Sequence, residues 1–347
     1  MATITSKFTD AVLSKKQLVL DGAFATELES YGCNLNDPLW SAKVLFEQPD
    51  LVKKVHNSYL AAGADIIESS GYQATVVGFQ DKGFSHCEAI ELVKLSVRTA
   101  IAARDEFVAA SGHKTNSVES NNSDSNCTDP NGTDSYSAID VLDNGQLATP
   151  IVAASVGPYG AFLADGSEYR GDYNVGDNVL VDFHKGRIAL FAEEQPDVFA
   201  CETVPSLQEA RALAEVLSDE LVSRNIPAWI SFSCADEEHT CGGDLIEDCA
   251  EFLDTVDAVQ AIGVNCTQPK YVESLIRHIK AKTNKAIVVY PNTGELYDDV
   301  NKTWFGEADA FDQYAKTWAE AGAQIIGGCC RTGLKNIGRI AEWAHIP

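Results

Sequence analysis

The chain has 347 residues, of which 45% are hydrophobic and 22% are charged, as in an ordinary globular enzyme. The formal net charge is -25, and because phosphate binding needs clustered Lys and Arg, nucleic acid is not expected as a partner. No apolar run reaches the roughly 18 residues of a membrane span, and the polar N-terminus lacks the apolar core of a signal peptide. We therefore expect a cytoplasmic protein whose ten cysteines are thiols or metal ligands rather than disulfides.

Short apolar or β-branched runs alternate along the chain with longer amphipathic stretches. Eight runs predict strands, at residues 18–21, 65–68, 150–155, 198–201, 228–232, 261–264, 286–289 and 324–326. Each is followed by a predicted helix, at residues 50–62, 87–107, 177–193, 206–221, 245–255, 269–282, 308–321 and 334–344. Strands that alternate with helices form a parallel sheet, and eight such units favour an α/β fold of the (β/α)8 TIM-barrel type. A doubly wound open sheet is the alternative topology.

Residues 111–145 differ from the rest of the chain because they are rich in Ser, Asn and Asp and poor in apolar residues. Such a segment cannot bury enough surface to offset the entropy cost of ordering, so we predict that it is disordered. It falls between the second predicted helix and the third predicted strand, a join that lies at the bottom of a barrel, away from the catalytic rim. We therefore treat residues 1–347 as one barrel domain that contains 111–145 as an insertion.

The active sites of such barrels form where the strands end, and three cysteines follow strand ends in this chain. Cys266 follows the sixth predicted strand, and Cys329 and Cys330 follow the eighth. Neighbouring residues on a strand point to opposite faces, so both can bind one ion only if the chain turns, as Gly327-Gly328 would allow. Three thiolates with an open fourth position are typical of a catalytic zinc site. The alternative is a buried core cysteine at 266 and a chance pair at 329 and 330.

The remaining thiols and histidines show no comparable pattern. We expect packing roles for four cysteines, namely Cys33, Cys87, Cys201 and Cys249. A second metal site at Cys234 and Cys241 is a weaker possibility, because both fall in one loop after the fifth predicted strand. We expect four histidines to be either exposed or hydrogen-bonded, namely His56, His86, His184 and His239.

Several motifs lie at the strand ends: residues 21–28 read DGAFATEL, 263–266 read GVNC, 327–331 read GGCCR and 165–171 read DGSEYRG. Together they resemble the homocysteine S-methyltransferase family, and the last stretch is most similar to its S-methylmethionine-dependent branch. The family also includes betaine–homocysteine methyltransferase and the homocysteine domain of cobalamin methionine synthase. The resemblance covers nearly the whole chain.

The resemblance implies that one zinc ion per chain is held by Cys266, Cys329 and Cys330. It also implies that Asp21 and Glu202 meet the amino group of homocysteine. The backbone at Phe24 and Ala25 would meet its carboxylate. The structural alternatives are that Asp21 caps the helix that follows it and that Glu202 belongs to a buried ion pair.

Two further candidates for substrate binding have open roles. Tyr72 follows Ser70-Gly71, where relatives often have Asn or Thr before the Tyr. Asn292 either orients a ligand or caps its own turn.

The resemblance implies methyl transfer from a sulfonium donor to the thiol of L-homocysteine, which forms methionine. The donor is S-methylmethionine or S-adenosylmethionine, although the chain has no Gly-rich nucleotide motif. One alternative is the same barrel with betaine or another methyl donor. The other is a non-catalytic protein that buffers zinc or thiols.

Overall fold

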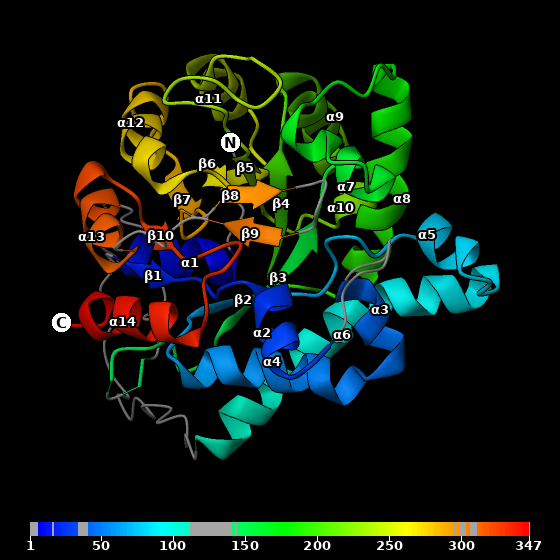
Figure 1. The fold of residues 1–347 in the computed structure, drawn as a ribbon, viewed down its shortest axis with the longest axis horizontal. Helices are drawn as coiled ribbons and strands as arrows, with labels where there is room; N and C mark the ends of the chain where they lie inside the picture. The colour runs from blue at the N-terminus through cyan, green and yellow to red at the C-terminus, as the bar shows by residue number, and fades with distance from the viewer. Residues whose placement is uncertain are drawn as a thin grey trace, which may run out of the picture.

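Eight parallel strands form a ring that is surrounded by helices (Figure 1). The computed structural model describes residues 6–15, 17–33, 41–111, 141–142, 144–294, 296–298, 303–305 and 311–346. Neighbouring strands follow the order β1-β10-β7-β6-β5-β4-β3-β2, and a parallel bridge between Leu20 and Ile66 joins the two ends of this row. The sheet is therefore a (β/α)8 barrel, as predicted, and the open doubly wound sheet is wrong.

All eight predicted strands are confirmed. They are β1 (Leu18–Val19), β2 (Ile66–Glu68), β3 (Ile151–Val156), β4 (Val198–Val204), β5 (Ala228–Phe232), β6 (Val259–Asn265), β7 (Ala286–Tyr290) and β10 (Ile325–Ile326). A short antiparallel hairpin, β8 (Leu296–Asp298) and β9 (Thr303–Phe305), was not predicted and follows the end of β7.

The eight predicted helices are also confirmed. They are α4 (Pro49–Ala61), α6 (His86–Ala110), α8 (Asp177–Glu193), α9 (Leu207–Ser218), α11 (Ile246–Asp254), α12 (Pro269–Lys280), α13 (Phe311–Ala321) and α14 (Leu334–Ala344). The helix expected after Asp21 is present as α2 (Phe24–Ser30). The other shorter helices were not predicted: α1 (Lys7–Ser14), α3 (Ser41–Glu47), α5 (Val76–Asp81), α7 (Tyr159–Leu163), a 3-10 turn (Ser167–Tyr169) and α10 (Glu220–Ser223). None of the described helices is long and apolar enough to cross a membrane.

The strands place alternate side chains in two separate cores, because successive residues of a strand point to opposite faces. Leu18, Ile66 and Val288 belong to a core that fills the inside of the ring. Their neighbours Val19 and Ile67 belong to the larger core between the strands and the helices. This alternation tells which strand residues face the interior of the barrel.

Helix α1 covers the end of the barrel where the strands begin. Its Phe8 is fully buried within the inner core, and its ring lies 5.7 Å from that of Trp229, centroid to centroid. The Ser6 side chain accepts a hydrogen bond from the Thr9 backbone and so caps the helix. The sequence analysis missed α1 because its single buried face is too short to show a clear period.

Most of the predicted insertion, residues 112–140 and 143, lies outside the described residues. Its disorder therefore stays a prediction. Its C-terminal flank is fixed near the start of β2. There the side-chain amide of Gln146 donates to the carbonyls of Leu60 and Ala64, at 2.9 Å each. This flank therefore lies at the bottom of the barrel, opposite the ends of the strands.

Candidate active site at the mouth of the barrel

The inward positions of the strands change from apolar to polar at the C-terminal end of the barrel. Glu68, Ser155, Glu202 and Ser231 each come two residues after a member of the inner core, namely Ile66, Ala153, Ala200 and Trp229. These polar groups are bonded to one another and to their neighbours. The Ser155 hydroxyl donates to Glu202, and the Ser231 hydroxyl lies 2.6 Å from that of Tyr290. The mouth of the barrel is thus a polar layer on an apolar plug.

Asn265, at the end of β6, holds two strand ends in place. Its side-chain oxygen accepts from the backbone N–H of Thr203 at 2.7 Å and from the Ser231 hydroxyl at 2.9 Å. Its side-chain nitrogen donates to the Thr203 hydroxyl at 2.8 Å. Thr203 and Cys266 both have left-handed backbone conformations, with φ of 58° and 48°. Such strain is costly for residues other than glycine and is typical of functional sites.

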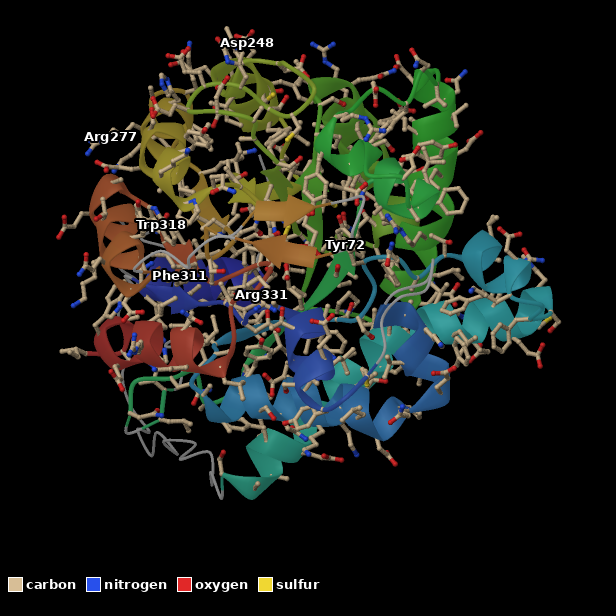
Figure 2. The ribbon with its side chains drawn as sticks, in the orientation of Figure 1. Tyr72, Asp248, Arg277, Phe311, Trp318 and Arg331 are labelled. Atoms are coloured by element: carbon tan, nitrogen blue, oxygen red, sulfur yellow. A yellow bond between two sulfur atoms is a disulfide. The ribbon has the colours of Figure 1, made fainter. Side chains whose placement is uncertain are left out.

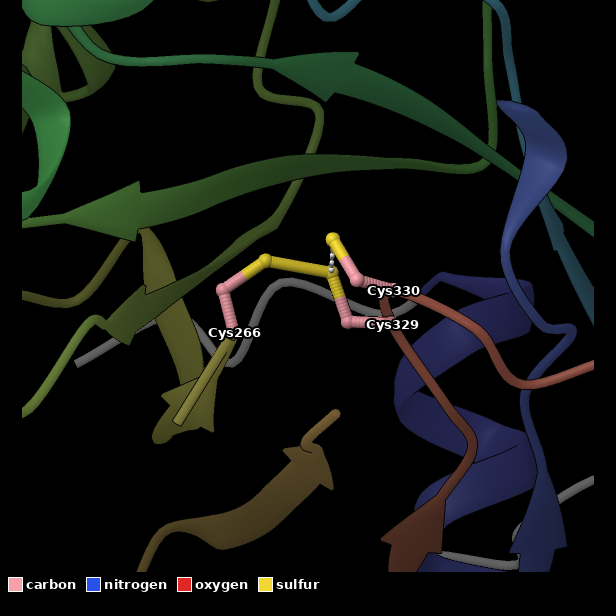
Figure 3. A group of neighbouring side chains, drawn as sticks. All are labelled: Cys266, Cys329 and Cys330. Atoms are coloured by element: carbon pink, nitrogen blue, oxygen red, sulfur yellow. Dashed lines mark hydrogen bonds between the residues drawn. A yellow bond between two sulfur atoms is a disulfide. The ribbon is translucent and has the colours of Figure 1, made fainter. Parts of the chain in front are cut away.

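Three cysteines from two strand ends lie together at this mouth (Figure 3). The sulfur atoms of Cys266, Cys329 and Cys330 all lie within 4.8 Å of one another. The structure joins Cys266 and Cys329 as a disulfide, and the sulfur of Cys330 lies 3.9 Å from that of Cys329. No other group of three possible metal ligands occurs within the described part of the chain. The structure thus brings these sulfurs into a group that can hold a metal ion once all three are reduced.

The turn after β10 allows two adjacent cysteines to face the same group. A Cβ on Gly327 would come within 2.7 Å of the carbonyl oxygen of Asp21, and one on Gly328 within 2.3 Å of the Thr332 hydroxyl. Only glycine fits these approaches. Thr332 closes the turn, because its backbone N–H and its hydroxyl donate to the Cys329 carbonyl at 3.0 and 2.5 Å.

The electrostatic surroundings oppose ionisation of the cysteine that is not in the disulfide. Burial raises the pKa of the Cys330 thiol to about 12, and the nearby charges of Glu202 and Glu168 act in the same direction. A thiol with such a pKa stays protonated at neutral pH unless a cation binds beside it. The donor set therefore fits a soft, positively charged metal ion.

Two of the expected substrate-binding acids lie at this same mouth. Asp21 and Glu202 are 2% and 6% exposed. Burial raises the pKa of both carboxyls, to about 7 for Glu202, and repulsion from Glu202 raises that of Asp21 further. The interpretation of Asp21 as a helix cap is wrong, because Ala23 is the N-cap of α2 and no side chain caps that helix.

Glu68 is a third carboxylate of this site, and the sequence analysis missed it. Its backbone N–H donates to Oδ2 of Asp21 at 3.0 Å, and its pKa is raised by burial first and then by the charges of Glu202 and Asp21. The signal was present in the sequence, since Glu68 ends β2 two residues after an inward Ile66, just as Glu202 follows Ala200 on β4.

Tyr72 lies within the ring of helices in Figure 2, whereas Asp248 and Arg277 lie on its periphery. Its side chain is half-buried, and burial raises its pKa well above the usual value, with the Glu168 charge acting next. Its backbone carbonyl accepts from the Arg187 guanidinium at 3.3 Å. Tyr72 is therefore a neutral side chain at the edge of the carboxylate layer.

The remaining candidates, Phe24, Ala25 and Asn292, also lie at strand ends. Phe24 and Ala25 are half-buried in the first turn of α2, where backbone N–H groups have no partner within the helix. Asn292 is 9% exposed, and its side-chain oxygen is buried with no hydrogen-bond partner in the described segments. That oxygen does not cap its own turn there, which leaves it available to a ligand.

Two minor expectations are wrong. Cys87 is exposed in the first turn of α6 and is not a packing residue, whereas Cys201 and Cys249 are buried as expected. His56 is neither exposed nor hydrogen-bonded: it is fully buried, and neither ring nitrogen has a partner among the residues that the structure describes. Its ring lies 5.0 Å from that of Phe24, centroid to centroid, so an apolar contact fixes its place.

The structure is a parallel (β/α)8 barrel whose mouth brings three cysteine sulfurs and the carboxylates of Asp21, Glu68 and Glu202 to one end, as in a barrel enzyme with a metal-binding site. Comparison with known proteins identifies its family. A model of the homocysteine S-methyltransferase family matches residues 18–344. The homocysteine S-methyltransferase YbgG of Bacillus subtilis is 45% identical over 94% of each chain, and homocysteine S-methyltransferase 1 of Zea mays is 42% identical over 93% of each.

Solved structures of the homocysteine methyltransferase MmuM from Escherichia coli have the same fold. Its metallated form has a TM-score of 0.77 at 36% identity and covers 95% of this chain and 97% of its own. Its oxidized form has the same TM-score at 35% identity, over 97% and 99% of the two chains. The chain belongs to the homocysteine S-methyltransferase family, and the predicted class of enzyme, a methyltransferase, is confirmed.

Proposed function

We propose that this chain transfers a methyl group from a sulfonium donor, preferentially S-methylmethionine, to the thiol of L-homocysteine. One zinc ion per chain is held by Cys266, Cys329 and Cys330, and residues 1–347 act as a single domain. The observation that carries this proposal is the meeting of three sulfurs within 4.8 Å of one another on the rim that also carries Asp21 and Glu202.

The residues of the mouth can bind both charged ends of homocysteine. Asp21 and Glu202 are buried acceptors, and a charge-assisted hydrogen bond to an ammonium is strong in such a place. The first-turn N–H groups at Phe24 and Ala25 can bind the carboxylate. Tyr72 and the amide oxygen of Asn292, unpartnered in the described part of the chain, would contact the methyl donor. The substrate is thereby held by its backbone-like end, with its thiol directed at the three cysteines.

The reaction needs an ionised thiol and an aligned methyl group. When bound, zinc would coordinate and deprotonate the homocysteine thiol, which is otherwise mostly protonated at neutral pH. The homocysteine sulfur then forms a bond to the methyl carbon, the bond from that carbon to the donor sulfonium breaks, and its electron pair stays on the donor sulfur. Because the leaving group is a neutral thioether, no general acid is required, and the residues of the mouth act by positioning. With S-methylmethionine, both products are methionine.

The test uses Cys330→Ser with Cys87→Ser as its matched control, because Cys87 is an exposed cysteine on α6. Reduced wild-type protein should bind about one zinc per chain and form methionine from homocysteine and S-methylmethionine. Cys330→Ser should lose zinc and turnover, whereas Cys87→Ser should keep both. Full zinc occupancy in Cys330→Ser would overturn the ligand assignment.

A comparison of donors separates the alternatives. Equal amounts of S-methylmethionine, S-adenosylmethionine and betaine are supplied to the same zinc-loaded enzyme, and methionine is measured. We expect the fastest turnover with S-methylmethionine. Turnover with betaine alone would favour the other donor class, and zinc binding without turnover from any donor would favour the buffering protein.

A further inference from the structure

Glu68 is an acidic side chain at a position that faces the interior of the barrel. Along β2, Ile66 belongs to the inner core and Ile67 to the outer core, so the next residue points inward again. Glu68 also pairs in register with Ala153 of β3, which belongs to the inner core. The carboxylate therefore enters the polar layer above the apolar plug, beside the other groups of the mouth.

The surroundings of Glu68 are rich in acceptors. Its backbone N–H donates to Oδ2 of Asp21, and the negative charges of Glu202 and Asp21 repel its carboxylate. The Tyr290 side chain forms a hydrogen bond with it. Oε1 of Glu68 remains buried without a partner in the part of the chain that the structure describes. Burying an unsatisfied carboxylate oxygen is costly, which indicates that a ligand supplies the missing donor.

Asp21 also has a buried carboxylate oxygen that lacks a hydrogen-bond donor among the described residues. It is 2% exposed, and its Oδ1 is likewise buried without a partner across the described ranges. Arg187, whose charge acts on Glu202, does not fill this gap, because its guanidinium donates to the carbonyls of Tyr72 and Gly157. Within the described chain, Asp21 and Glu68 thus each have one carboxylate oxygen without a donor, and the charges of Asp21 and Glu202 both act on Glu68, so the three carboxylates lie near one another.

We propose that Glu68 binds the ammonium group of homocysteine together with Asp21 and Glu202, a role that rests on the proposed function. A primary ammonium carries three N–H donors, which matches one donor to each carboxylate. Its positive charge also reduces the mutual repulsion of the three acids. Glu68 is then a determinant of specificity for the amino group, whereas the cysteines act on the thiol.

The test compares Glu68→Gln with wild type on two thiols that differ only in the amino group, homocysteine and 4-mercaptobutanoate. Binding of each thiol to the zinc-loaded protein is measured by calorimetry, and KM is measured at a saturating donor concentration. Glu215→Gln serves as the control, because it makes the same charge change on an exposed position of α9. We expect Glu68→Gln to weaken homocysteine binding about tenfold, to leave 4-mercaptobutanoate binding unchanged, and to leave the KM of the donor unchanged.

A second measurement separates substrate binding from a structural role. Since Glu68 is repelled by two acids in the ligand-free protein, Glu68→Gln should melt at the same or a higher temperature than wild type. A lower melting temperature with unchanged homocysteine binding would overturn the proposal, as would an equal loss of affinity for both thiols or an effect confined to the donor. Calorimetry tests Glu68 independently of turnover, so homocysteine binding without methyl transfer would refute the proposed function alone.

Discussion

Burial of His56 should make the protein lose stability in mild acid by an amount that one substitution can isolate. The side chain is fully buried, and burial lowers its pKa from the usual value of 6.5 to about 3. The folded state therefore resists protonation, whereas the unfolded chain binds a proton below about pH 6.5. The free energy of unfolding therefore keeps its full value above about pH 6.5 and decreases as the pH falls below it.

The size of the effect follows from the two pKa values. pH 5 lies about 1.5 units below the pKa of His56 in the unfolded chain. At roughly 1.36 kcal/mol per unit, protonation there stabilises the unfolded state by about 2 kcal/mol. His56→Leu removes the titrating group and keeps a similar volume beside Phe24. It also removes two buried nitrogens that have no partner in the described residues, so the variant should be more stable at pH 8 as well.

The assay is urea unfolding of wild type and His56→Leu at pH 8, 7, 6 and 5. Other titrating groups affect both proteins alike, so the difference between the two curves reports His56. The advantage of the variant should grow by about 2 kcal/mol from pH 8 to pH 5. Parallel pH profiles would refute the reasoning and would mean that His56 is solvated or hydrogen-bonded in the folded protein.

Three further predictions concern the mouth and the insertion. Glu202→Gln should raise the KM for homocysteine about tenfold, equal to about 1.4 kcal/mol, with unchanged zinc content; near-wild-type kinetics would leave Glu202 a structural role. Asn265→Ala removes the partners of the Thr203 N–H, the Thr203 hydroxyl and the Ser231 hydroxyl, and should lower the free energy of unfolding by about 2–4 kcal/mol in urea titrations. An unchanged unfolding midpoint would contradict that account. Replacing residues 112–140 by a short flexible linker should leave the turnover rate within about tenfold of wild type. A larger loss, above about 1.4 kcal/mol of barrier, would indicate that the segment acts on the site.

The architecture could be predicted from the sequence because each strand and its helix carry a local signal. Apolar runs such as 228–232 and amphipathic stretches such as 269–282 are long enough to reveal their period, and their alternation fixes the parallel order. Short elements escape this approach. Helix α1 has few buried positions, and the β8–β9 hairpin has three-residue strands, so neither shows a period.

The site was predictable where residue type limits the chemistry and was missed where packing decides. Cysteines at two strand ends indicate a metal site because few other roles need three thiols on one rim. The residue types of Glu68 and His56 do not limit their chemistry in this way. The inward register of β2 makes Glu68 a member of the carboxylate layer, and the packing of α4, which includes the contact with Phe24, buries His56.

The features that lower the stability of this fold are concentrated in the polar layer at the mouth of the barrel. Two residues with left-handed backbones, Thr203 and Cys266, lie there beside carboxylates whose pKa values are raised by burial. The layer beneath is an apolar plug, packed by fully buried side chains such as Trp229 and Leu18, and its burial offsets these costs. Because the ammonium group of homocysteine and a metal ion would both reduce the repulsion in the upper layer, each should stabilise the fold on binding. Substitutions that remove an acid from the mouth should therefore stabilise the ligand-free protein and weaken the stabilisation that homocysteine provides.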